Sequence, residues 1–183
     1  ANLLKSAIYF DFRGVWGDRR AADQVFSGVL RKIGSNTLFQ QQMAQNALQH
    51  RPPIGRLRDF VVARSGAEKD TLDIKVQGLG PFVDGARLLA LANGIAASNT
   101  QERLQQLRQR GVLDPLDADA YIEGYQFIQL VRMQQHQQQD REQRPFSNRL
   151  DPDSLNQLDR RILRESFRQA KRLQGSLALR YNL

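Results

Sequence analysis

Apolar positions in the first quarter of the chain follow a strand-like pattern and then a helical one. Residues 6–13 are rich in β-favouring side chains and stop at Gly14, which predicts a single leading strand. Residues 18–33 carry apolar side chains every three to four positions, which predicts a helix with one apolar stripe. A second helix is predicted from residue 35 to residue 49, because a pair of prolines follows.

The rest of the chain is mostly helical in pattern. Residues 54–79 contain two β-favouring runs and predict a small hairpin or an irregular insertion. Almost every residue from 82 to 97 is apolar, so this helix belongs in the middle of a bundle. Capping patterns predict further helices over 99–111, over 114–141 and from Asp151 onward.

These segments predict a mainly α fold, an antiparallel helical bundle with a leading strand and a small extended insertion. The 183 residues are 40% hydrophobic and 25% charged, which is typical of a globular chain. The absence of cysteine excludes disulfides, thiolate zinc sites, iron–sulfur clusters and a cysteine nucleophile. No run of apolar residues is long enough to span a membrane, so we expect a cytoplasmic protein.

One acidic residue lies within the apolar run of the predicted leading strand. Asp11 and Arg13 are two residues apart, so they lie on the same face of that strand. A carboxylate among apolar neighbours needs a cation, a backbone donor or a metal as its partner. Two interpretations follow: a local Asp11–Arg13 ion pair, which we favour from spacing alone, and a catalytic role for Asp11.

Charged residues also interrupt the apolar central helix. Asp84 and Arg87 are three residues apart and therefore adjoin on one face, which favours an intrahelical ion pair. Lys75, Gly78 and Gly80 precede this helix. A glycine turn before a helix can offer backbone donors to an anion such as phosphate, although a glycine pair is weak evidence for it.

Basic residues form a stripe along the last predicted helix, which we call the basic stripe. Its members recur every three to four residues: Arg160, Arg161, Arg164, Arg168, Lys171 and Arg172. A solvated outer face is the favoured interpretation, because acidic residues are interspersed. Nucleic-acid binding is disfavoured, since neither a helix-turn-helix signature nor an aromatic stacking platform accompanies the stripe.

A resemblance to a known family rests on four ordered segments: Asp73-Ile74-Lys75, Gly78-Leu79-Gly80-Pro81-Phe82-Val83-Asp84 and on through Leu91, Asn99-Thr100-Gln101-Glu102-Arg103-Leu104, and Asn148-Arg149-Leu150-Asp151-Pro152 and on through Arg180. Residues 35–183 resemble the nucleotidyltransferase substrate-binding domain of bacterial signalling proteins, which often carry CBS domains and a cyclic-nucleotide-binding module. More distantly, they resemble the uridylyltransferase that modifies the PII nitrogen regulator. Residues 7–18 resemble the end of the polymerase-β-like nucleotidyltransferase domain that precedes it.

The resemblance implies two parts, a nucleotidyltransferase remnant at residues 1–34 and a helical substrate-binding domain at 35–183. It places Asp11 as the third carboxylate of a catalytic Mg²⁺ site. The glycine-serine loop and the other two carboxylates are expected upstream, so we do not expect this chain to be active alone. Four charged residues are candidates for substrate or nucleotide binding: Arg13, Lys75, Asp84 and Arg87.

The leading functional hypothesis is therefore the substrate-binding part of a bacterial signalling nucleotidyltransferase. The resemblance implies Mg²⁺ and an NTP as cofactors, upstream nucleotidyltransferase and CBS domains, and a protein acceptor such as a PII-like regulator. The alternative is a non-catalytic helical interaction module that binds an acidic partner or nucleic acid through the basic stripe.

Overall fold

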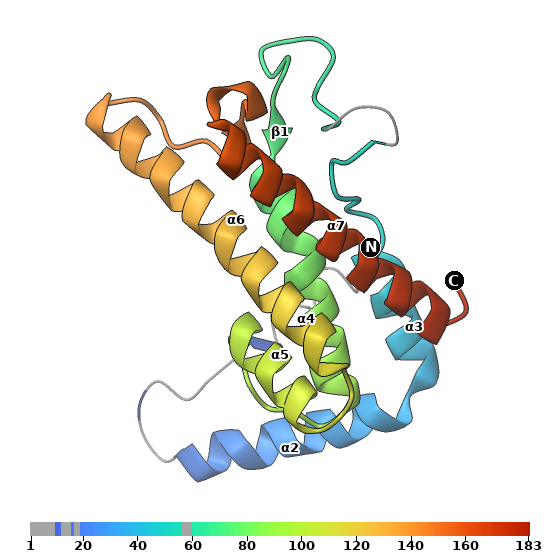
Figure 1. Cartoon of the computed structure of the whole chain (residues 1–183). Helices are drawn as coiled ribbons and strands as arrows, with labels where there is room; N and C mark the ends of the chain where they lie inside the picture. The colour runs from blue at the N-terminus through green and yellow to red at the C-terminus, as the bar shows by residue number, and fades with distance from the viewer. Residues whose placement is uncertain (1–9, 12–15, 17–18, 56–59) are drawn as a thin grey trace.

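The computed structural model describes residues 10–11, 16, 19–55 and 60–183 of the chain (Figure 1). In chain order its elements are α2 (Arg19–Ser35), α3 (Thr37–Ala47), strand β1 (Leu72–Asp73), π-helix η2 (Ile74–Leu79), α4 (Gly80–Ala92), α5 (Thr100–Gln109), α6 (Pro115–Arg141), strand β2 (Arg149–Leu150), 3-10 helix η3 (Pro152–Ser154) and α7 (Gln157–Arg180). The predicted mainly α fold is confirmed.

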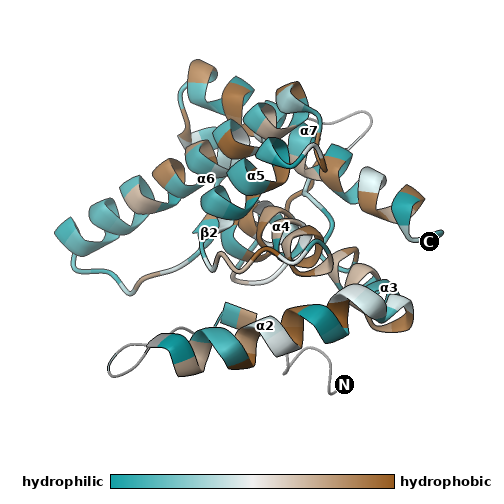
Figure 2. Ribbon diagram, turned by 90° about the horizontal axis from the view of Figure 1, so that it is seen from below, coloured by the Kyte–Doolittle hydropathy of each residue, from teal (hydrophilic) through white to brown (hydrophobic). Residues whose placement is uncertain are grey.

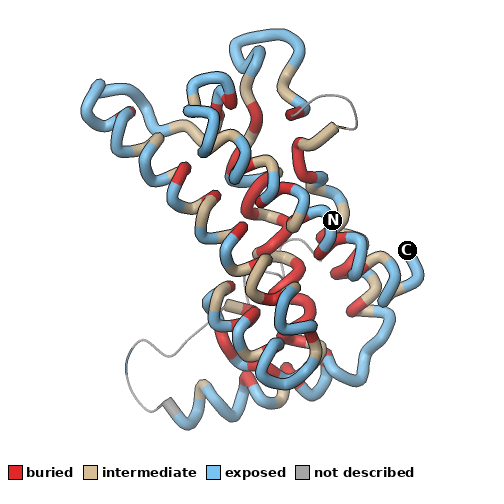
Figure 3. The backbone as a smooth tube through the Cα atoms, in the orientation of Figure 1, coloured by how far each residue is buried: buried red, intermediate tan, exposed pale blue. Residues whose placement is uncertain are grey.

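Helix α4 is the central element of the bundle. Its buried side chains point in every direction around the helix axis: Phe82, Ala86, Leu88, Leu89, Ala90 and Leu91. Helices α2, α3, α5 and α7 all contact it, and Figure 3 shows the buried residues concentrated along it. A helix that is apolar on all sides must be covered on all sides, which explains why the other helices surround α4.

The two longest helices, α6 and α7, pack against each other. Asp114 caps α6 as predicted, because its carboxylate accepts hydrogen bonds from the Leu116 and Asp117 N–H groups. The predicted start of the last helix is wrong. Asp151 caps only the short η3 turn, and Asn156 caps α7 by accepting from the Asp159 N–H. No helix in the described ranges combines the length and apolar character that a membrane crossing requires.

The glutamine-rich second half of α6, whose residues are mostly coloured as hydrophilic in Figure 2, holds the returning chain beside it. Gln135 Nε2 donates to the Arg149 carbonyl at 2.5 Å. Gln139 is buried, and its Oε1 accepts from the Ser147 N–H at 3.0 Å. These amides therefore fix the segment that leads into β2.

The predicted extended insertion is mostly irregular. Its only assigned strand among the described residues is β1, which pairs antiparallel with β2 through Leu72–Leu150 and Asp73–Arg149. Asp73 then ends the strand, because its carboxylate accepts from the Lys75 and Val76 N–H groups and caps η2. The strand partner of β1 thus comes from the far end of the chain, while Ala63 exchanges backbone hydrogen bonds with Asp70 and Thr71 just before β1.

The predicted leading strand is wrong at the two residues of it that the structure describes. Phe10 and Asp11 lie in a 3-10 turn. The Phe10 ring packs edge-on against Phe39 of α3, with ring centroids 5.8 Å apart. β propensity is weak without a partner strand, so this contact and the ion pairs of Asp11 decide the local backbone. The rest of residues 6–13 lies outside the described residues.

Close packing of α4 on α7 predicts a specific sensitivity at Gly85. A Cβ at Gly85 would lie 2.9 Å from Leu173 Cδ2 and 3.4 Å from Leu177 Cδ1. We expect Gly85→Val to lower the free energy of unfolding by about 1–3 kcal/mol, because it overpacks this contact. Urea unfolding followed by circular dichroism measures the change.

Gly28→Val is the matched control, since nothing lies within 4 Å of a Cβ at that position in α2. Its effect should stay within about 0.5 kcal/mol. Equal unfolding midpoints for Gly85→Val and the wild type would contradict the close α4–α7 contact.

Candidate functional site

Four charged side chains meet beside the central helix. We call Asp11, Asp84, Arg87 and Arg103 the charge network. Arg87 lies two turns into α4 and joins two carboxylates: its Nη1 donates to Asp84 Oδ1 at 2.8 Å and its Nη2 to Asp11 Oδ2 at 2.7 Å. The predicted Asp84–Arg87 pair on one helix face is thereby confirmed, and Asp11 joins it from a position 76 residues away.

Arg103 is the most buried member of the charge network. Its side chain is 1% exposed, and its Nη2 donates to Asp11 Oδ1 at 2.5 Å. Its Nε donates to the Ala97 carbonyl at 2.7 Å, which fixes the guanidinium against the loop before α5. The sequence analysis did not select Arg103 as a site residue. The signal was its place on the buried face of α5 with Leu104 and Leu107, where an arginine requires a partner.

Burial and ion pairing shift the pKa values of Asp11 and Asp84 in opposite directions. Burial alone would raise the pKa of Asp11, but hydrogen bonds from Arg87 and Arg103 and their charges outweigh it, so this pKa lies below its ordinary value. Burial raises the pKa of Asp84, and the charge of Arg87 compensates only in part. Asp11 is thus the firmly ionised carboxylate of the two.

The charge network does not by itself form a magnesium site. Both Asp11 oxygens accept hydrogen bonds from guanidinium groups, whose positive charge disfavours a metal ion beside them. The described ranges contain no group of three or more His, Cys, Asp or Glu side chains that could hold a metal. The catalytic and metal-binding roles of Asp11 stay predictions that need further carboxylates from a preceding segment.

The other two predicted site residues do not join the charge network in the described structure. Lys75 is exposed and lies in η2, roughly three helical turns before Arg87. None of the residues described forms an ion pair with its ammonium group. Arg13 lies outside the described residues. Substrate binding by Lys75 and Arg13 therefore stays a prediction.

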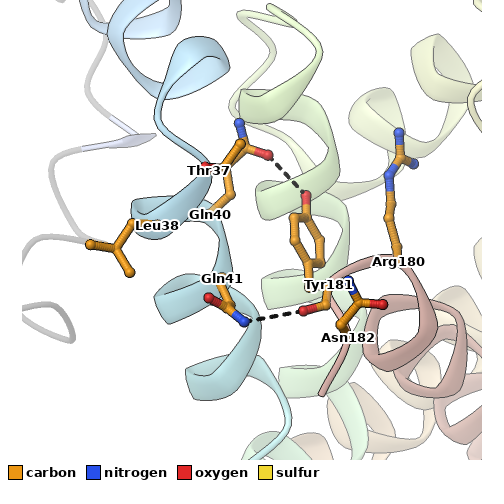
Figure 4. Close-up of a pocket in the computed structure, with 7 residues that line it drawn as sticks. All are labelled: Thr37, Leu38, Gln40, Gln41, Arg180, Tyr181 and Asn182. Atoms are coloured by element: carbon orange, nitrogen blue, oxygen red, sulfur yellow. Dashed lines mark hydrogen bonds between the residues drawn. The ribbon is translucent and has the colours of Figure 1, made fainter.

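A polar pocket of about 550 Å³ lies between the start of α3 and the end of α7 (Figure 4). Its polar lining residues are Thr37, Gln40, Gln41, Arg180, Tyr181 and Asn182. Gln41 Nε2 donates to the Tyr181 carbonyl at 3.3 Å, and the Tyr181 hydroxyl donates to Gln40 Oε1 at 3.4 Å. Burial raises the pKa of Tyr181, so its hydroxyl keeps its proton. Such hydroxyl and amide groups suit hydrogen bonding to a polar ligand.

The basic stripe on α7 is partly engaged within the chain. Arg172 pairs with Asp117 of α6 at 2.7 Å, and Arg168 pairs with its helical neighbour Glu165. Arg160 pairs with Asp153 and lies 5.4 Å above the Phe60 ring. These contacts favour the interpretation of the stripe as a solvated outer face over a surface for nucleic acid.

Comparison with protein families identifies most of this chain. Residues 37–181 match the family described as "Putative nucleotidyltransferase substrate binding domain". The match runs from the start of α3 to the turn after α7. No curated protein and no solved structure shows a significant match to the chain.

Removal of the Asp11 charge should destabilise the fold through Arg103. In Asp11→Asn the Arg103 guanidinium stays buried without a carboxylate, and we expect a loss of about 2–4 kcal/mol in the free energy of unfolding. The exposed pair Arg160–Asp153 supplies the control: Asp153 is 76% exposed, so Asp153→Asn should cost at most about 0.5 kcal/mol. Equal losses in the two variants would show that Arg103 does not depend on Asp11.

A pH titration of stability should separate Asp11 from Asp84. The folded pKa of Asp11 lies below its ordinary value of 3.8, so its ionised form stabilises the fold above that pH. This contribution is lost as the pH falls through the lower folded value. The raised pKa of Asp84 acts in the opposite direction, because the folded state takes up this proton first and acidification relieves the buried charge.

Urea midpoints measured from about pH 7 to pH 3 test this difference. Below about pH 4 the midpoint of Asp11→Asn should fall less steeply than that of the wild type. Just above about pH 4 the midpoint of Asp84→Asn should fall more steeply than that of the wild type. Curves parallel to the wild type for both variants would contradict the assignment.

Proposed function

Since the chain belongs to the family of nucleotidyltransferase substrate-binding domains, we propose that it is the helical substrate-binding part of an enzyme that transfers a nucleotidyl group from an NTP to an acceptor. The observation that carries this proposal is the contact of Asp11 with Arg87 and Arg103. It joins the segment before α2 to the centre of the bundle. A substrate-binding domain must be held in a fixed place relative to the catalytic groups that it serves.

In this class of reaction an acceptor oxygen attacks the α-phosphorus of the NTP. The bond from the α-phosphorus to the bridging oxygen breaks, pyrophosphate leaves and the acceptor loses its proton. Magnesium, when bound, stabilises the charge on the phosphate oxygens. In our proposal a preceding segment supplies most of the groups that bind the metal and the NTP. Arg87 and Arg103 keep Asp11 ionised and in one orientation at the junction.

We further propose a protein acceptor, such as a PII-like regulator, in a cytoplasmic bacterial signalling protein with CBS domains. The support is the resemblance of the ordered segments from Asp73 to Pro152 to domains of that kind. The partly engaged basic stripe of α7 gives no specific support to the alternative, a non-catalytic interaction module that binds an acidic partner or nucleic acid.

Pyrophosphate release by the complete gene product tests the proposal. The protein is incubated with Mg²⁺, a purified PII-like acceptor and each of the four NTPs, labelled on the α-phosphate. We expect release of pyrophosphate and label on the acceptor with one NTP. Arg87→Met should reduce the rate by about tenfold or more, since it removes one of the two groups that orient Asp11.

Arg161→Ala is the control, because this arginine lies on the exposed face of α7 and outside the charge network. It should leave the rate unchanged. A gene product that releases no pyrophosphate with any NTP, although it is folded by circular dichroism, would contradict the proposed function.

A further inference from the structure

A second groove of about 550 Å³ lies where the end of α3 meets the C-terminal half of α7. We call it the α3–α7 groove. Leu48, Pro52 and Ile54 line one side, and Ala178 and Leu183 line the other, so its walls are largely apolar. Its volume lies within the range of small-molecule sites in proteins, about 300–1,000 Å³.

Gln174 holds the two walls of the α3–α7 groove together. This side chain is 6% exposed, and its Nε2 donates to the carbonyls of Ala47 at 2.8 Å and His50 at 2.9 Å. The end of α3 is therefore tied to α7 across the groove. Among the described residues none donates a hydrogen bond to Gln174 Oε1, which leaves an acceptor at the lining.

Gly175 gives the α3–α7 groove open space next to the helix backbone. It lies within α7, where glycine is disfavoured relative to residues with a side chain. Apart from the adjacent residues and the backbone of α7 itself, no atom of the described residues lies within 4 Å of a Cβ placed there, so their packing does not require glycine at this position. The contrast is Gly85, where a Cβ would meet Leu173 at 2.9 Å. A ligand could approach the α7 backbone at Gly175 without a clash.

The charged side chains that line the α3–α7 groove have one sign. Arg51 and Lys171 line it, and both are exposed. No ion pair between either of them and a carboxylate occurs in the described part of the chain, and none of the described lining residues has an acidic side chain. The groove is thus complementary to a negatively charged group carried by an apolar body.

We propose that the α3–α7 groove binds a nucleoside phosphate, with the base on the apolar walls and the phosphates beside Arg51 and Lys171. The choice of a nucleotide among organic anions rests on the proposed function. Gln174 Oε1 offers an acceptor for an amino or hydroxyl group of the nucleoside. The inference adds a ligand site distinct from the charge network, because the groove and the network have no described residue in common.

Titration calorimetry of the 183-residue chain with each of the four NTPs and with inorganic triphosphate tests the inference. We expect an NTP to bind with a stoichiometry of one per chain. It should bind more tightly than inorganic triphosphate, since the base adds apolar contact. Gly175→Leu should reduce the affinity by about tenfold or more, because leucine fills the groove where the chain leaves space. Lys171→Glu should reduce it by a similar factor, because it reverses a charge beside the phosphates.

Two matched variants control for the fold and for net charge. Gly28→Leu changes a helical glycine that also has no neighbour within 4 Å, and Arg161→Glu reverses an exposed charge of α7 outside the groove. Both should bind the NTP as the wild type does. Unchanged circular dichroism spectra and urea midpoints show that each groove variant is folded.

Three results would overturn the inference: no NTP binds at millimolar concentration, Gly175→Leu binds like the wild type, or an acidic peptide binds in the groove while NTPs do not. Pyrophosphate release by the complete gene product separates this inference from the proposed function. If Gly175→Leu leaves NTP binding unchanged while release occurs, the groove assignment alone fails. If the groove variants lose NTP binding while the wild type releases no pyrophosphate, the proposed function alone fails.

Discussion

A guanidinium group removed from water is the constraint on which the arrangement of this domain depends. Arg103 is 1% exposed in the middle of the helical bundle, and its charge is balanced by Asp11 from the start of the chain. An unpaired buried charge is strongly unfavourable, so the bundle has its full stability only with that segment docked. Docking of residues 10–11 is therefore coupled to the folding of α4 through Arg87 and of α5 through Arg103.

Polar side chains also make the joints around the apolar centre. Gln174 of α7 donates to the carbonyl of Ala47 at the end of α3 and to that of His50 just after it, and Gln40 of α3 donates to the Ile33 carbonyl at 2.8 Å. Apolar contacts are not directional, whereas these hydrogen bonds require particular distances and angles between the helix ends. The two pockets of about 550 Å³ described above lie along the α3–α7 joint, where glutamine amides link the helices in addition to apolar packing.

Local patterns were enough to predict most helices, their caps at Asn99 and Asp114, and the Asp84–Arg87 pair, since all of these depend on neighbours within four residues. The partner of Arg103 lies 92 residues away, and no local spacing reports such a distance. Lys75 was grouped with Arg87 because both are charged residues on otherwise apolar segments, although the first turns of the helix separate the two. The strand prediction at Phe10 used β propensity, which tertiary contacts overrode.

The π-helical turn η2 has a consequence for changes in chain length. A π-helix uses more residues per turn than an α-helix, and η2 (Ile74–Leu79) runs directly into the central helix. Loss of one residue between the cap Asp73 and Gly78 would convert this turn to ordinary α geometry and leave the register of α4 against its neighbours intact. The junction is thus a place where evolution could delete a single amino acid with the structural change confined to the turn itself.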